Sequence, residues 1–357
     1  MAKKILLTTL ALALMASGIA FANGAKEDDN GWVGGKPSYV VGHIVYTFEA
    51  QYHQAVAKQI VEYGKKMYNA KVIVLDGQGK DDATMAAVEN LIQQKVQAIS
   101  LHNPNTGLTT TAIKMARAKG IPAVTTLIRP SEMIAPHVQP LEGPSSQRMG
   151  EVAATQWLKA HPGTQCRVFM LDFGKFAQIE EMRTGPFFQG VKNVDPTAVL
   201  VGQLNGESST VKSMELTLDA LQKDPKINII FGGNDEMGLG ALSACQQLGR
   251  GKMNNGVPLT EVIAGLDANV SAMAQIYNPN SSFKLTHGAV RDVAYAEMDT
   301  MIGMITGKID PNKYAETQVL SREFDYWNST IDEAQRFLEV NYLFTGSLKD
   351  EVAKASK

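Results

Sequence analysis

The chain has 357 residues, a formal net charge of -2 and 44% hydrophobic residues. This length is enough for two domains of ordinary size, and the lack of a basic surplus argues against nucleic acid as a partner. The chain holds only Cys166 and Cys245, so it cannot depend on a framework of several disulfides, and whether these two cysteines pair stays open.

Residues 1–22 have the layout of a cleavable secretory signal. Two lysines precede an apolar run over residues 5–16, and Ala20-Phe21-Ala22 has the small-x-small pattern of a cleavage site. A membrane anchor is the alternative, but the apolar run is shorter than the roughly 20 residues that span a bilayer. We therefore expect a soluble exported protein that begins near Asn23, with a formal charge of -4 once the two lysines are removed from a total of -2.

Residues 23–37 are polar and contain glycine, which is typical of a flexible leader. After them, a short β-branched apolar run, a polar loop and a stretch with helical apolar spacing recur about eight times. The expected strands are 39–45, 71–75, 98–101, 123–127, 167–171, 199–203, 227–231 and 262–265. Their near-continuous apolar character is typical of strands with helices on both faces. The pattern predicts an α/β protein with doubly wound parallel sheets.

Polar and aromatic residues cluster after these strands. Ligands bind at the carboxyl ends of the strands in a doubly wound sheet, so these residues are candidates for a binding site. The candidates are Phe48, Glu49, Tyr52, His53, His102, Arg129, Phe173, Arg183, Asn205, Glu207, Asn234 and Asp267. Aromatic rings cover the C–H faces of a sugar, and amides, carboxylates and guanidinium groups hydrogen-bond adjacent hydroxyls, so the set favours a polyol. Any one of them, taken singly, is better explained as a loop or capping residue, and Asp235 is expected to cap a helix.

The usual sequence signatures of catalysis are absent. The chain has no GxGxxG after a strand, no P-loop, no GxSxG elbow and no HExxH, and its six histidines lack the spacing of metal ligands. We therefore expect neither enzymatic activity nor a cofactor or bound metal. An exported hydrolase on the same fold is an alternative that turnover of the ligand would reveal.

Four segments resemble the type I periplasmic sugar-binding proteins of ABC transporters, the group that binds ribose, xylose or galactose. They are Phe231-Gly232-Gly233-Asn234-Asp235-Glu236-Met237-Gly238-Leu239-Gly240-Ala241, Gly120-Ile121-Pro122-Ala123-Val124-Thr125, Val262-Ile263-Ala264-Gly265-Leu266-Asp267 and Arg183-Thr184-Gly185-Pro186-Phe187. The resemblance covers nearly all of the mature chain. It implies that Arg183, Asn234 and Asp267 hydrogen-bond the ligand, together with Arg129.

The resemblance also implies two lobes joined by a three-segment hinge. The N-terminal lobe is expected over 38–139 and 289–321, and the C-terminal lobe over 140–288 and 322–357. A periplasmic monomer that closes on a sugar and is then recognised by an ABC permease follows from this similarity.

Alternatives remain open for both the ligand and the partner. His287 is expected at the pocket in the place of a glutamine, and this change, with those around Tyr52 and His53, argues against ribose itself. Arg129 and Arg183 suit either a neutral or an acidic sugar. A chemoreceptor is a further partner to consider, and a sensor of a nucleoside or signalling furanose is the rival function. A sugar-responsive repressor would carry a helix-turn-helix in place of the secretory signal.

Overall fold

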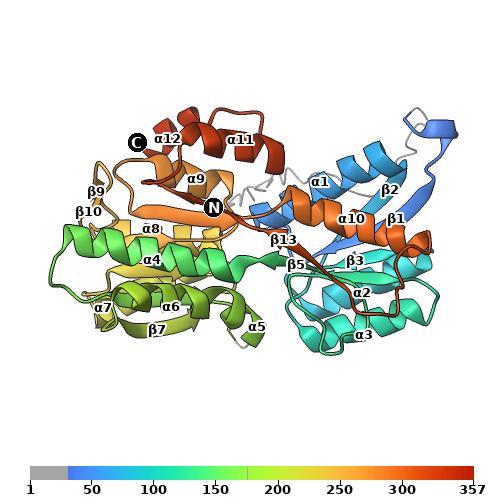
Figure 1. The fold of residues 1–357 in the computed structure, drawn as a ribbon, viewed down its shortest axis with the longest axis horizontal. Helices are drawn as coiled ribbons and strands as arrows, with labels where there is room; N and C mark the ends of the chain where they lie inside the picture. Colours follow the sequence, from blue (N-terminus) through green and yellow to red (C-terminus); the bar gives the residue numbers. More distant parts are fainter. Residues whose placement is uncertain (1–30, 175) are drawn as a thin grey trace, which may run out of the picture.

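The computed structural model describes residues 31–174 and 176–357, which form two lobes of alternating strands and helices that lie side by side (Figure 1). The expected signal, 1–22, and residues 23–30 of the expected leader lie outside the described residues. The remainder of the leader contains a 3-10 turn, Val33–Gly35, and the backbone N–H of Val33 donates to the side chain of Asn69. Within the described ranges, no helix is long and apolar enough to cross a bilayer.

The first lobe has a six-stranded sheet in the order β2-β1-β3-β4-β5-β13, and all of its strands are parallel. The strands are β1 Tyr39–Val45, β2 Ala70–Asp76, β3 Ile99–Leu101, β4 Ala123–Thr126, β5 His137–Leu141 and β13 Glu316–Leu320. Its helices are α1 Gln51–Tyr68, α2 Asp81–Gln93, α3 Thr106–Arg117 and α10 Arg291–Ile305.

The second lobe has a six-stranded sheet in the order β7-β6-β8-β11-β12-β14, in which β14 runs antiparallel to β12. The strands are β6 Arg167–Asp172, β7 Val199–Asn205, β8 Ile229–Gly232, β11 Val262–Ala264, β12 Phe283–Gly288 and β14 Arg322–Asp325, and β9 Met253–Asn254 pairs with β10 Val257–Pro258 in a separate hairpin. The helices are α4 Glu142–Ala160, α5 Ala177–Ile179, a π-helical turn Glu180–Thr184, α6 Gly185–Val194, α7 Thr210–Lys223, α8 Asp235–Gln247, α9 Val270–Tyr277, α11 Ile331–Asn341 and α12 Leu348–Ala355.

The chain passes between the two sheets at three places. It leaves the first sheet where β5 is followed by α4, returns where β12 is followed by α10, and leaves again between β13 and β14. The second passage is tied to α11, because the Asn341 side chain accepts hydrogen bonds from the backbone N–H groups of Val290 and Arg291.

The predicted α/β fold with doubly wound parallel sheets is confirmed, and each of the eight expected strands is present with its ends shifted by at most two residues. Six further strands, β5, β9, β10, β12, β13 and β14, were not predicted. In β12 the reason is visible, because Lys284 and His287 are fully buried polar residues that break the apolar pattern. Cys166 and Cys245 are both buried and free, which settles that they do not pair.

Candidate functional site

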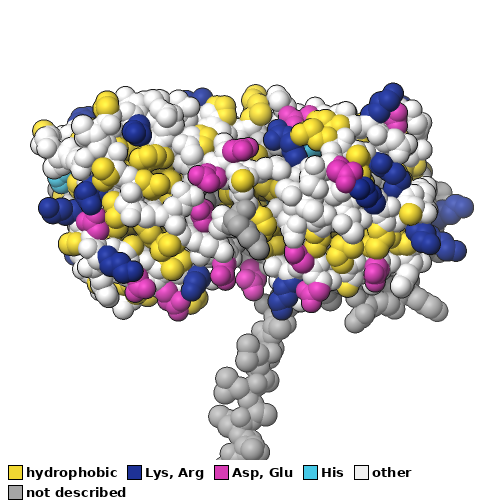
Figure 2. Space-filling model, turned by 90° about the horizontal axis from the view of Figure 1, so that it is seen from below, with side chains coloured by type: hydrophobic (Ala, Val, Ile, Leu, Met, Phe, Trp, Pro, Cys, Tyr) yellow, Lys and Arg dark blue, Asp and Glu magenta, His cyan; other side chains and the backbone are white. Residues whose placement is uncertain are grey.

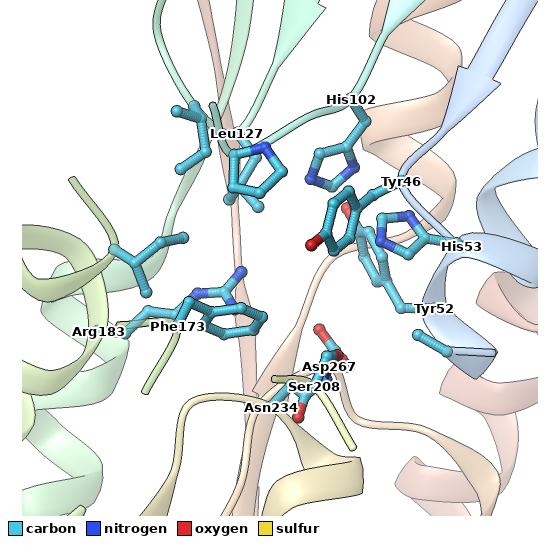
Figure 3. A pocket seen from close by; sticks show the side chains of 14 residues that line it. Tyr46, Tyr52, His53, His102, Leu127, Phe173, Arg183, Ser208, Asn234 and Asp267 are labelled. Carbon is cyan, nitrogen blue, oxygen red and sulfur yellow. Dashed lines mark hydrogen bonds between the residues drawn. The ribbon is translucent and has the colours of Figure 1, made fainter. Parts of the chain in front are cut away.

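A cavity lies between the two lobes, at the carboxyl ends of their strands (Figure 3). Its empty space measures about 460 Å³, including the mouth that opens to solvent. The first lobe contributes Tyr46, Ala50, Tyr52, His53, His102, Pro104, Leu127 and Ile128, and the second lobe contributes Phe173, Ile179, Arg183, Ser208, Asn234 and Asp267. A ligand in this cavity would therefore contact both lobes.

The first lobe lines the cavity with rings. Tyr52 and His53 lie in the first turn of α1, and His102 follows β3. The His53 and His102 ring centroids are 4.5 Å apart, and those of Tyr52 and His53 are 5.4 Å apart. Burial, with smaller effects from neighbouring groups, lowers the pKa of His53 to about 3 and lowers the pKa of His102 well below its ordinary value. Both imidazoles are therefore neutral at neutral pH, and each has one donor and one acceptor nitrogen.

Arg183 is placed by the π-helical turn between α5 and α6, a type of turn that occurs often at functional sites. Its Nε and Nη2 donate to the two carboxylate oxygens of Glu142, at 2.6 and 3.0 Å, and its Nη1 donates to the carbonyl of Gly233 at 2.7 Å. The guanidinium also lies over the ring of Phe173, 5.4 Å from its centroid. Burial opposes its charge, but Glu142, with smaller contributions from Asp267 and Tyr52, outweighs burial and raises the pKa of Arg183.

Asp267 follows β11 with an unusual backbone. Its φ is 121°, and that of Ala268 is 58°, so two consecutive residues other than glycine lie at positive φ. The loop is held by the Asp267 N–H, which donates to the His287 carbonyl at 2.7 Å, and by the Tyr342 hydroxyl, which donates to the Asp267 carbonyl at 2.7 Å. A Cβ on Gly288 would lie 2.2 Å from that carbonyl oxygen, so the close approach requires glycine. Such backbone strain concentrates at functional sites.

The Asp267 carboxylate faces the cavity without a protein partner. The residue is 5% exposed, and none of the described residues donates a hydrogen bond to its carboxylate oxygens. Burial raises the pKa of Asp267 well above its ordinary value, Glu236 adds to the increase, and Arg183 opposes it. A ligand that donates hydrogen bonds to this group would stabilise its ionised form.

Asn234 lines the cavity, and its side-chain amide also holds the local structure. Its side-chain oxygen caps α8 by accepting from the N–H of Met237 at 3.0 Å, and its Nδ2 donates to the Ser208 hydroxyl at 2.5 Å. The cap is thus Asn234 and not Asp235 as we expected. Asp235 is fully buried and accepts from the Thr286 hydroxyl at 2.7 Å, and burial raises its pKa to about 8.

The structure does not bring every candidate to the cavity. Phe48 packs against the small cluster of Val45, Ala57 and Val74. The side chains that point to solvent are Glu49, Asn205 and Glu207. His287 is fully buried in β12, where its Nε2 lies 3.0 Å from the hydroxyl of Ser146, and it reaches the Asp267 loop only through its carbonyl.

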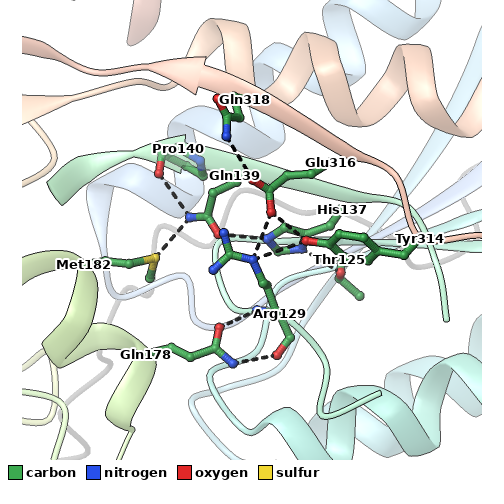
Figure 4. Close-up of polar contacts among 10 residues, drawn as sticks. All are labelled: Thr125, Arg129, His137, Gln139, Pro140, Gln178, Met182, Tyr314, Glu316 and Gln318. Carbon is green, nitrogen blue, oxygen red and sulfur yellow. Dashed lines mark hydrogen bonds and ion pairs between the residues drawn. The ribbon is translucent and has the colours of Figure 1, made fainter. Parts of the chain in front are cut away.

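Arg129 is turned away from the cavity and toward β13 (Figure 4). Its Nε donates to Glu316 at 2.9 Å and to the Tyr314 hydroxyl at 3.2 Å. Although burial alone would raise the pKa of Glu316, Arg129 and Tyr314 lower it to about 2. The Arg129 backbone joins the lobes, because its N–H donates to Gln178 Oε1 at 2.9 Å and its carbonyl accepts from Gln178 Nε2 at 3.0 Å.

Residues 41–309 match the family model for the periplasmic binding protein domain. The chain belongs to this family. It is 28% identical over 284 residues to the ribose import binding protein of Bacillus subtilis, a match that covers 77% of this chain and 84% of that protein.

Solved structures share the fold. A periplasmic solute-binding protein of an ABC transporter from Actinobacillus succinogenes, solved with D-allose, has a TM-score of 0.68 at 20% identity, covering 84% of this chain and 100% of that one. The myo-inositol-binding protein of Caulobacter has a TM-score of 0.69 at 17% identity, covering 84% and 96% of the two chains.

In this periplasmic binding protein domain, sequence reasoning missed several residues that line the cavity. They are Tyr46, Ala50, Pro104, Leu127, Ile128, Ile179 and Ser208. Tyr46 had a usable signal, because it is an aromatic residue directly after β1. The apolar members carry no chemical signal of ligand binding. Within the described residues, no three His, Cys, Asp or Glu side chains form a group that could hold a metal ion.

Proposed function

We propose that this protein is an exported solute-binding protein that captures a small sugar between its lobes and delivers it to an ABC permease. One observation carries the proposal: buried polar groups without partners among the described residues converge on one cavity. They are the Tyr52 hydroxyl, the ring nitrogens of His53 and His102, the Asp267 carboxylate and the remaining N–H groups of Arg183. Buried polar groups are costly to leave unpaired, and adjacent sugar hydroxyls both donate and accept.

Two aromatic side chains favour a sugar as the ligand over a polar compound that has no ring with C–H groups. Phe173 lies on the second-lobe side and Tyr52 on the first-lobe side of the cavity (Figure 3), where they offer apolar surface to the C–H groups of a ring. Ribose, D-allose and myo-inositol, which the names of the similar proteins mention, are all polyhydroxylated. We expect the ligand to be a compound of this class.

Hydrogen bonds between the lobes support capture by closure of the two lobes. Besides the Arg129–Gln178 pair, the N–H of Gln51 in the first lobe donates to Glu236 in the second at 3.1 Å, and Gln51 Nε2 donates to Ser271 at 2.9 Å. A ligand that contacts both lobes favours the closed state through its differential affinity for that state. Our proposed lobes are 38–139 with 289–321 and 140–288 with 322–357, hinged at the three passages of the chain.

The remaining parts of the proposal concern export and partners. We propose that residues 1–22 direct the chain to the periplasm. We also propose that the mature protein is a monomer that delivers its ligand unchanged to a permease, without catalysis or a cofactor. A chemoreceptor is a further candidate for recognition of the closed form.

The test is a thermal-shift screen of residues 23–357 against pentoses, hexoses, inositols, sugar acids and nucleosides. A ligand at about 100 times its dissociation constant adds roughly 2.7 kcal/mol of stability. We expect a clear shift with a sugar or cyclic polyol, and chromatography should recover that compound unchanged. A shift with nucleosides alone, or conversion of the ligand to a product, would overturn the proposal.

A further inference from the structure

We propose that Glu142 makes the site selective for uncharged sugars by cancelling the charge of Arg183 before any ligand arrives. The inference rests on the proposed function and refines it. Glu142 is not among the residues that line the cavity, so it acts through Arg183 and not by touching the ligand.

The ion pair is geometrically complete. Both Glu142 oxygens accept from the guanidinium, at 2.6 and 3.0 Å, and the two side chains are 6% and 5% exposed. Glu142 is the first residue of α4, where the positive end of the helix dipole also favours its negative charge. The positive charge of the guanidinium is therefore already balanced before a ligand binds, and its remaining N–H groups are free to donate to hydroxyls.

The other charged residues at the cavity offer no positive charge that could pair with an anion. Among the described lining residues, Arg183 is the cation and Asp267 is the acid, while His53 and His102 are neutral at neutral pH. Once Glu142 is counted, the site has no uncompensated positive charge. A sugar carboxylate would be buried beside Asp267 without a cation of its own, which is strongly unfavourable.

Two exposed acidic residues adjoin the residues that line the cavity. Glu49 and Glu207 are exposed, and each adjoins a lining residue, Ala50 and Ser208 respectively. Acidic side chains lie on both halves along their boundary on the face seen from below, and Lys and Arg side chains also lie close to it (Figure 2). Glu49 and Glu207, here called the rim, disfavour the approach of anions.

A buried ion pair is costly to desolvate, and apolar residues of similar volume often serve stability equally well. The Arg183–Glu142 pair has a use that an apolar pair would lack. It presents charge-assisted donors to neutral hydroxyls, which are stronger than uncharged donors, while adding no net charge to the site.

The experiment compares matched ligands that differ by one carboxylate. Wild type, Glu142→Gln, Glu151→Gln and the double variant Glu142→Gln with Arg183→Gln are titrated calorimetrically with glucose and glucuronate, and with galactose and galacturonate. Glu151 is a matched control because it lies on the same helix α4 and pairs with Gln147 and Asn193, not with Arg183. Titrations at low and physiological ionic strength separate the buried pair, which salt screens little, from the exposed rim.

We expect wild type to prefer the neutral member of the pair that binds by about a hundredfold or more. Glu142→Gln should reduce this preference about tenfold or more, because the Arg183 charge becomes available to the carboxylate. Glu151→Gln should keep the wild-type ratio. The double variant, which has no unpaired cation, should regain the preference for the neutral sugar.

Two results would overturn the inference alone: a wild type that binds the acid as tightly as the neutral sugar, or a Glu142→Gln protein with an unchanged ratio. If Glu142→Gln does not fold by circular dichroism, the wild-type ratio still decides. If no carbohydrate of either charge binds the wild type, the proposed function fails as well, which distinguishes the two failures.

Discussion

Replacing Asp267 by asparagine should weaken sugar binding and stabilise the ligand-free protein at the same time. The Asp267 carboxylate is buried, lacks a described hydrogen-bond donor, and is repelled by Glu236 and Asp235 behind the site. Asparagine keeps the shape of the side chain but removes the charge. The variant therefore loses a hydrogen-bond acceptor for the ligand. In the ligand-free protein it also avoids the unfavourable free energy of a buried, unpaired charge.

The magnitudes follow from the chemistry of that carboxylate. A hydrogen bond to a charged group contributes about 1.5 to 3 kcal/mol, and the amide retains only one acceptor oxygen, so Asp267→Asn should weaken affinity about tenfold or more. Because burial raises the pKa of Asp267 in the folded protein, its contribution to stability is fully present below the unfolded pKa near 4 and is lost as pH rises through the folded pKa. The gain in stability of the variant should thus be small near pH 4 and should grow as pH rises toward the folded pKa.

Calorimetric titration with the sugar found by the screen measures the first effect, and thermal unfolding without ligand from about pH 4 to pH 8 measures the second. Asp219→Asn is the matched control, because Asp219 is exposed on α7. Unchanged affinity in Asp267→Asn would refute its role in binding. Weaker affinity with lower stability at every pH would show that the side chain supports the fold, which contradicts the electrostatic argument.

Three further variants test the surroundings of the site. Gln178→Ala removes both hydrogen bonds to the Arg129 backbone, so we expect affinity to fall by up to about tenfold and the ligand-free radius of gyration from X-ray scattering to increase; identical scattering would contradict this. Gly288→Ala places a Cβ 2.2 Å from the Asp267 carbonyl oxygen, so calorimetry should show a loss of both affinity and melting temperature, and wild-type values for both would disprove the packing argument. Burial lowers the pKa of Lys284 from 10.5 to about 7, so the unfolded state binds the extra proton between these values and stability rises with pH there. Lys284→Met should remove a rise of up to about 1.4 kcal/mol per pH unit in urea denaturation, and equal slopes would show that Lys284 is not its source.

The strands that could be predicted from the sequence are those whose buried residues are apolar. β8 and β11 both pack against α4 and α8 and consist of continuous apolar runs, so their sequences alone indicate them. β12 is buried at every position but contains Lys284, whose Nζ donates to the carbonyls of Ile276 and Asn278 at 2.7 and 2.5 Å. Those acceptors belong to the end of α9, and no local pattern shows that a lysine will find them.

The site was predictable to the extent that position after a strand decides it. Seven candidates line the cavity, namely Tyr52, His53, His102, Phe173, Arg183, Asn234 and Asp267. The same rule also selected Arg129, whose side chain is held by Glu316, 187 residues later in the chain. Position along the sequence does not reveal such a competing partner, and it does not tell which way a loop side chain points, as Glu49 and Asn205 show.

The elements that carry the site divide its tasks between the lobes. Arg183, its partner Glu142 and Asp267 all belong to the second lobe, so the charges that act on a ligand are in place whatever the angle between the lobes. Tyr52 and His53 belong to the first lobe and reach the ligand only when the lobes approach. A sugar acid is therefore disfavoured on the open second lobe already, whereas sugars that differ in their hydroxyls are distinguished on closure. Charge selectivity should then change the association rate, and selectivity among neutral sugars should change the dissociation rate.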